Sequence, residues 1–159
     1  MNFIGKTFLS LFGIGYLPFM PGTFGSIASV FILFFLEKEL NTTLNAVFGL
    51  WILFVGVFFL SMYFIKNIVS EKNYDQPWIV IDEFLGMLIS TILIFFVENA
   101  HIELFIISFI LFRFFDIFKP LGIRKIDKGN SPAAVILDDL LAGIYTFVLT
   151  IPIYYLFLQ

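Results

Sequence analysis

Five long apolar runs separated by short polar segments constrain the fold of this chain more than any other feature of its sequence. A helix needs about 20 apolar residues to cross a membrane, and its backbone must satisfy its own hydrogen bonds in lipid. We therefore predict an all-α integral membrane protein with about five transmembrane helices. They are expected at residues 24–36, 44–65, 78–97, 104–118 and 133–158, and a short helix at residues 3–13 is expected to lie in the membrane interface.

The composition indicates that lipid is the main solvent of this chain. Of its 159 residues, 60% are apolar, 24 are Phe and 13% are charged, whereas soluble domains carry about 25% charged residues. The length suits one domain, residues 1–159, made of several short spans. The chain has no Cys, which excludes disulfides, thiolate metal sites and a cysteine nucleophile. Its one histidine, His101, is expected in a solvated outer loop.

The distribution of Lys and Arg predicts the orientation of the chain. With the N-terminus in the cytoplasm, the inner segments hold seven basic residues and the outer segments hold only Lys38. Because basic residues favour cytoplasmic loops, we predict that the N-terminus lies inside and the C-terminus outside. The same assignment places the unusual polar clusters on the inner side, at residues 13–26, 74–83, 112–120 and 136–139.

Five acids lie inside the apolar runs or at their inner ends: Asp82, Glu83, Asp116, Asp138 and Asp139. A charge at the centre of a membrane helix costs at least about 2.5–3.5 kcal/mol, so such residues usually have a function or a partner. With a rise of about 1.5 Å per residue, all five lie within about 10 Å of the inner helix ends. We expect them to share one shallow layer beneath the lipid headgroups, where the phosphate of a membrane lipid would lie.

Carboxylates with almost no imidazole and no thiolate favour a hard cation, Mg²⁺ or Mn²⁺, over zinc. We predict metal ligands among Asp82, Glu83, Asp138 and Asp139, and catalytic roles for Asp82, Asp116 and Asp139. Adjacent residues on a helix point about 100° apart, so one member of each acid pair is expected on the metal and the other on a basic partner or on a hydrogen-bond donor behind the metal. The nucleophile stays open between a metal-activated water and a carboxylate that forms an aspartyl-phosphate.

Basic residues near the same layer supply positive charge for a phosphate: Arg113, Lys119 and Arg124. Thr23 or Ser26 can cap the first long helix. Alternatively, Thr23 belongs to a glycine-rich turn whose backbone N–H groups bind the phosphate. A structural role is the alternative for the bases. Arg113 and Asp116 are spaced as an intrahelical ion pair, and the remaining bases can set topology or bind anionic headgroups. Asp127 is expected in a solvated loop.

Four segments in order carry a recognisable pattern. They are G-x-G-Y-L-P-x-x-P-G-T-x-G-S at 13–26, I-V-I-D-E-x-x-G-M at 79–87, F-R-F-F-D-I-x-K-P at 112–120, and 123–143, which ends in L-D-D-L-L-A-G. Together they resemble the phosphatidylglycerophosphatase A family of lipid phosphatases over nearly the whole chain. The resemblance implies a Mg²⁺-dependent enzyme of the bacterial inner membrane. Such an enzyme removes the terminal phosphate of phosphatidylglycerophosphate and leaves phosphatidylglycerol.

One segment departs from that resemblance. Members of the family carry a His-Gly-Gly-x-Gly-like run before the Asp-Asp pair, whereas this chain has D-K-G-N-S-P-A-A-V with one residue fewer. Asn130 and Ser131 are candidates to take over the role of that loop.

Two other functions fit parts of the pattern. Another lipid-headgroup phosphotransferase would use similar carboxylates, although the D-G-x-x-A-R signature of the CDP-alcohol type is absent. A small ion-coupled transporter or channel subunit would use intramembrane acids as a relay, but near the midplane and between internal repeats.

Overall fold

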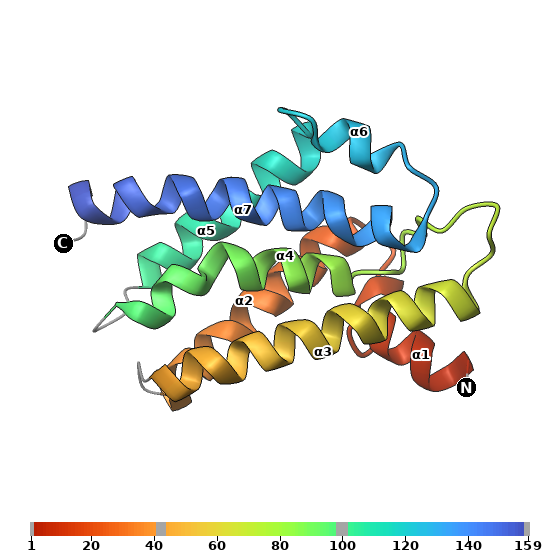
Figure 1. The fold of residues 1–159 in the computed structure, drawn as a ribbon, viewed down its shortest axis with the longest axis horizontal. Helices are drawn as coiled ribbons and strands as arrows, with labels where there is room; N and C mark the ends of the chain where they lie inside the picture. The colour runs from red at the N-terminus through yellow and green to blue at the C-terminus, as the bar shows by residue number, and fades with distance from the viewer. Residues whose placement is uncertain (1, 41–43, 98–101, 158–159) are drawn as a thin grey trace.

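The computed structural model describes residues 2–40, 44–97 and 102–157 (Figure 1). Every predicted apolar run forms a helix in this part of the chain, which confirms the all-α prediction. The end of the fifth run at residue 158 and His101 lie outside the described residues. The elements are α1 (Asn2–Leu9), η1 (Ile14–Tyr16), α2 (Pro21–Leu40), α3 (Leu44–Ile68), α4 (Ile81–Thr91), η2 (Ile92–Phe96), α5 (Ile102–Phe118), α6 (Ile123–Asp127) and α7 (Pro132–Phe157).

The short helix α4 occupies the centre of the bundle, and nearly all of its residues are buried. It packs against the four longer helices α2, α3, α5 and α7. At one end of the bundle, α1 packs on α3 and α6 packs on α7 (Figure 1). Both α4 and α7 start at this end, so their first turns lie together at the loop-bearing end of the molecule.

The third run begins as a helix later than expected. Helix was predicted from Trp78, but residues 69–80 are irregular and α4 starts at Ile81. The N–H of Val80 donates to the carbonyl of Leu9 at 2.9 Å, and the Trp78 ring stacks on Tyr16 with centroids 5.8 Å apart. These long-range contacts hold the 69–80 segment across the end of α4 and keep it from continuing the helix.

The predicted caps of the first long helix are wrong. The helix α2 starts at Pro21, whose fixed φ and missing N–H suit the first helical position. The Ser26 hydroxyl donates back to the Gly22 carbonyl at 2.9 Å, and the Thr23 hydroxyl accepts a hydrogen bond from Arg113 at 3.2 Å. The Ser26 hydroxyl therefore bonds within α2 and the Thr23 hydroxyl bonds to α5, and neither bond is made to a free N–H group of α2.

Large apolar side chains cover much of the outer surface. On α3, Ile52 is 74% exposed and Phe59 is 66% exposed. Among the described residues, two helices are long and apolar enough to cross a membrane, Val47–Ile68 and Pro132–Leu156. The 11-residue α4 and the 17-residue α5 are shorter. The prediction of five spans therefore goes beyond what helix length and composition establish.

Two glycines bring α4 and α7 into close contact. A Cβ atom added at Gly143 would lie 2.5 Å from the backbone oxygen of Gly86, and one added at Gly86 would lie 2.8 Å from the backbone oxygen of Asp139. Small residues allow helix backbones to approach closely in this way. Because both helices start at the same end, the residues one turn before each glycine face each other. These residues include Asp82, Glu83 and Asp139.

Candidate active site

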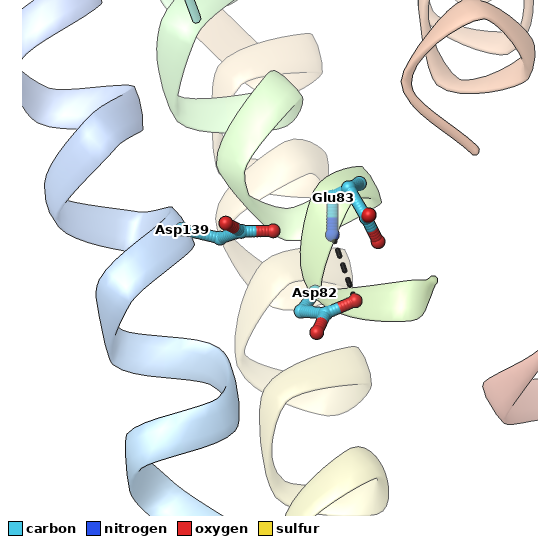
Figure 2. A group of neighbouring side chains, drawn as sticks. All are labelled: Asp82, Glu83 and Asp139. Carbon is cyan, nitrogen blue, oxygen red and sulfur yellow. Dashed lines mark hydrogen bonds between the residues drawn. The ribbon is translucent and has the colours of Figure 1, made fainter. Parts of the chain in front are cut away.

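Three buried carboxyl groups meet one turn before the glycine contact (Figure 2). Asp82 and Glu83 come from the first turn of α4, and Asp139 comes from α7. Each offers an oxygen atom, and these three atoms lie within 4.8 Å of one another. The residues are only 8%, 8% and 5% exposed. Like charges so close and so buried repel, and a proton or a bound cation relieves the repulsion.

The two adjacent acid pairs behave differently. Asp138 turns away from the group and accepts a hydrogen bond from the Lys119 ammonium at 2.7 Å, so this pair divides as expected between a shared site and a basic partner. In the other pair, Asp82 and Glu83 both lie beside Asp139. An Asp82 oxygen accepts the N–H of Glu83 at 3.1 Å (Figure 2). This bond folds Asp82 back over the first turn, and the longer Glu83 side chain reaches the same region.

Lys119 lies between two carboxylates. It follows α5 with a φ of 46°, and its ammonium donates to Asp138 and also to Asp127. Burial alone would lower the pKa of Lys119, but the hydrogen bonds and charges of the two aspartates outweigh it and raise the pKa above its usual value. The ammonium is therefore charged at neutral pH. An ammonium has three N–H donors, and two of them are used here.

Asp127 is a site residue that the sequence did not reveal. It was expected in a solvated loop, but it lines the same cavity as the other acids and pairs with Lys119. The short helix α6 turns the chain back over α7 and so returns Asp127 to the site. No periodicity or motif around residues 123–127 signals this return. The spacing of eight residues from Lys119 is informative only once the turn between them is known.

All of these groups line one cavity of about 200 Å³. The five predicted acids are in its wall, together with Lys119 and Asp127. The five acids therefore share one cavity. Pro21 and Gly22 of α2, Asp82 of α4 and Ala134 of α7 also line the cavity, so three helices present their first turns to it. Helix N-termini carry partial positive charge and free N–H groups, which favour a bound anion such as phosphate.

Arg113 lies behind this wall and connects two helices. Its guanidinium donates to Asp116 at 2.5 Å, which is the ion pair suggested by their spacing. It also donates to Thr23 at 3.2 Å and to Ser26 at 3.3 Å, which ties α5 to α2. Asp116 is a lining residue of the cavity, whereas Arg113 and Thr23 are not. Arg113 therefore fixes the position of Asp116 and the start of α2.

Arg124 is not brought to the cavity. Its side chain is exposed, and its guanidinium donates to the carbonyl of Phe118 at 3.3 Å. Of the four residues predicted to bind phosphate, only Lys119 lies in the cavity wall.

The acid group fits a hard divalent cation. Its donors are all carboxylate oxygens, the ligands that Mg²⁺ prefers. Oε2 of Glu83 is buried without a hydrogen-bond partner among the described residues. Within the same part of the chain, no ion pair neutralises Asp82, Glu83 or Asp139. A cation would both satisfy the free oxygen and offset the repulsion among the three acids.

Comparison with known proteins identifies the family. A family model described as phosphatidylglycerophosphatase A matches residues 7–154. The chain belongs to the phosphatidylglycerophosphatase A family. It is therefore a lipid phosphatase, and the five predicted acids of the cavity lie within the segments that first resembled this family.

Several curated relatives are similar over most of their length. A protein of Bacteroides thetaiotaomicron with the provisional name phosphatidylinositol-3-phosphatase is 33% identical over 87% of this chain and 86% of its own length. The phosphatidylglycerophosphatase A of Haemophilus influenzae is 30% identical over 91% of this chain and 85% of its own. The enzyme of that name from Escherichia coli is 28% identical over 84% and 73%. No solved structure matches the chain.

Proposed function

We propose that this phosphatase hydrolyses the terminal phosphate monoester of phosphatidylglycerophosphate, giving phosphatidylglycerol and phosphate, with Mg²⁺ as cofactor. The family match and the names of two relatives support this substrate. The observation that carries the chemistry is the group of three buried carboxyl groups in one cavity with Lys119.

Each residue of the cavity has a role in this proposal. Asp82, Glu83 and Asp139 would hold the cation, which supplies positive charge that stabilises the phosphoryl oxygens when it is bound. Lys119 keeps one N–H donor free for a phosphate oxygen while Asp127 and Asp138 hold its ammonium in place. In this proposal Asp138 thus forms an ion pair with Lys119 and does not bind the metal. Asp116, oriented by Arg113, is a further acid that faces the substrate.

The proposed enzyme is a single multi-pass domain of the bacterial inner membrane, with five spanning helices and the cavity on the cytoplasmic side. The exposed apolar surface of α3 supports lipid as its surroundings, because monomeric soluble proteins rarely expose such large apolar patches. The asymmetry of Lys and Arg supports the orientation. In this orientation the cavity lies at the depth of the lipid headgroups.

Phosphate release by the purified protein in detergent tests the proposal. The substrates are phosphatidylglycerophosphate, phosphatidylinositol 3-phosphate and phosphatidic acid, each measured with EDTA and then with added Mg²⁺. We expect the first to be hydrolysed with the highest kcat/KM, no activity in EDTA and full recovery with Mg²⁺. Full activity in EDTA would refute the metal site. A preference for phosphatidylinositol 3-phosphate would show that the substrate is the inositol lipid, as in the name of the Bacteroides relative.

A further inference from the structure

Two loops at the open end of the cavity are joined by one side chain. The Asn130 side-chain oxygen accepts the N–H of Tyr74 at 3.2 Å, and its amide nitrogen donates to the carbonyl of Glu71 at 2.9 Å. Both ends of the amide are thus used to connect residues 128–131 with the irregular segment 69–80. Tyr74 is itself buried, which anchors this segment from the other side.

The connected segment presents two polar side chains to the cavity that phosphate chemistry does not use. Asp75 and Gln76 follow Tyr74 directly, and both line the cavity. The Gln76 amide nitrogen donates to the carbonyl of Asn73 at 3.0 Å, so this bond orients the amide and leaves its oxygen as an acceptor. Asp75 is exposed and also offers acceptor oxygens.

An anionic carboxylate and an amide oxygen are unsuitable neighbours for phosphate oxygens, because acceptors facing acceptors repel. They suit hydroxyl groups, which donate hydrogen bonds. In a phospholipid with a terminal phosphate monoester, the headgroup unit between the two phosphates carries hydroxyl groups when this unit is a polyol.

We propose that Asp75 and Gln76 form a recognition site for the headgroup hydroxyl of the substrate, and that Asn130 is the positioning residue of this site. The proposal rests on the proposed function and adds the feature that selects the headgroup. The acids would hold a cation that, together with Lys119, binds the terminal phosphoryl group in the cavity. Asp75 and Gln76 then accept hydrogen bonds from the polyol that links it to the lipid. The divergent loop at 128–131 acts by fixing the segment that carries both acceptors.

A comparison of two substrates tests this site. Short-chain phosphatidylglycerophosphate is compared with its analogue in which hydrogen replaces the headgroup hydroxyl, using the full chain in detergent with Mg²⁺. We expect the wild type to prefer the hydroxylated lipid by about tenfold or more in kcat/KM, because a site with unpaired acceptors discriminates against a ligand that lacks the donor. In Gln76→Leu and in Asp75→Ala, we expect the preference to fall to about threefold or less.

The positioning role of Asn130 has its own measurement. Asn130→Ala is expected to raise KM for the hydroxylated lipid and reduce the preference, with a smaller change in kcat. Asn130→Asp, which keeps an acceptor for the Tyr74 N–H, should recover part of the preference. Lys72→Gln is the matched control, because this side chain lies on the same segment, is exposed and is not in the cavity wall.

The outcomes separate the two proposals. A wild type that hydrolyses both lipids equally well, or variants that keep the full preference, would overturn the recognition site while leaving the phosphatase function in place. A wild type that releases phosphate from neither lipid would overturn the proposed function itself. Melting temperature in detergent is measured for each variant, and the ratio of the two substrates stays interpretable even when the amount of folded protein falls.

Discussion

Gly22→Ala is expected to inactivate the enzyme without unfolding it. Gly22 lies at the start of α2 and lines the cavity opposite Glu83. A Cβ atom at this position would lie 2.2 Å from Oε1 of Glu83, whereas ordinary van der Waals contacts begin at 3.4 Å. The Glu83 carboxyl group must therefore move by about 1.2 Å, the difference between these distances.

The fold should tolerate this movement. The displaced atom is the end of a flexible side chain, and the next neighbour, Nη1 of Arg113, lies at an ordinary 3.5 Å. Alanine is also favoured over glycine in a helix by about 1 kcal/mol. The reaction should not tolerate it, because a misplacement of about 1 Å in an active site can lower the rate about 100-fold. We therefore expect about a 100-fold loss in kcat/KM and an unchanged or slightly higher melting temperature.

The assay is phosphate release at several Mg²⁺ concentrations, together with thermal unfolding in detergent. Displacement of Glu83 should also raise the Mg²⁺ concentration that gives half-maximal rate. Gly49→Ala is the control, since a Cβ atom there meets nothing within 4 Å, and it should keep wild-type activity. A Gly22→Ala enzyme that folds and retains the wild-type rate and Mg²⁺ requirement would show that Glu83 is not a working part of the site.

The same geometry leads to four more predictions. Asp139→Asn should lower kcat by at least about 100-fold with normal folding, because the amide removes a charge that holds the cation; a normal rate would make the acid structural. Asp127→Asn should lower kcat/KM about tenfold by loosening its lysine partner, a charge-assisted bond of the kind that contributes about 1.5–3 kcal/mol, and an unchanged rate would place it outside the site. Gly143→Ala should lower both melting temperature and activity, because its Cβ would meet a backbone oxygen of α4 at 2.5 Å; wild-type stability would contradict the close helix contact. Single cysteines at Lys72 and Glu39 should react with impermeant reagents only from the cytoplasm and only from outside, respectively, and the reverse pattern would contradict the orientation.

The helices could be predicted from the sequence because each apolar run determines its own local structure. The irregular segment before α4 could not be predicted from the sequence. Residues 78–80 are apolar and look like a continuation of the helix, but their backbone is held by Leu9 and by the stacking of Trp78 on Tyr16. Contacts between residues so far apart in sequence leave no periodic signal. The start of α4, and with it the recognition segment around Gln76, therefore had to come from the structure.

The acids of the site could be predicted by type and by depth, since charges in apolar runs are costly wherever they point. Their division between the group of three and the partner of Lys119 could not be predicted for both pairs. It depends on the rotation of α4 against α7, which the contact of Gly86 with Gly143 determines. The role of Arg113 was open for a related reason. A spacing of three residues indicates the ion pair with Asp116, but only the packing of α2 on α5 shows that the guanidinium faces Thr23 rather than the cavity.

The glycine contact between α4 and α7 is also the point about which a change in their crossing angle would turn the two helices. Membrane helices adjust to bilayers of different thickness by tilting. The acids lie one turn from the pivot, about 5.4 Å, so a change of about 10° in the crossing angle moves them by about 1 Å. The end of α7 at Phe157 lies 14 residues beyond Gly143, or about 21 Å, and moves by nearly 4 Å. A change in the crossing angle therefore moves the far end of α7 about four times as far as it moves the acids.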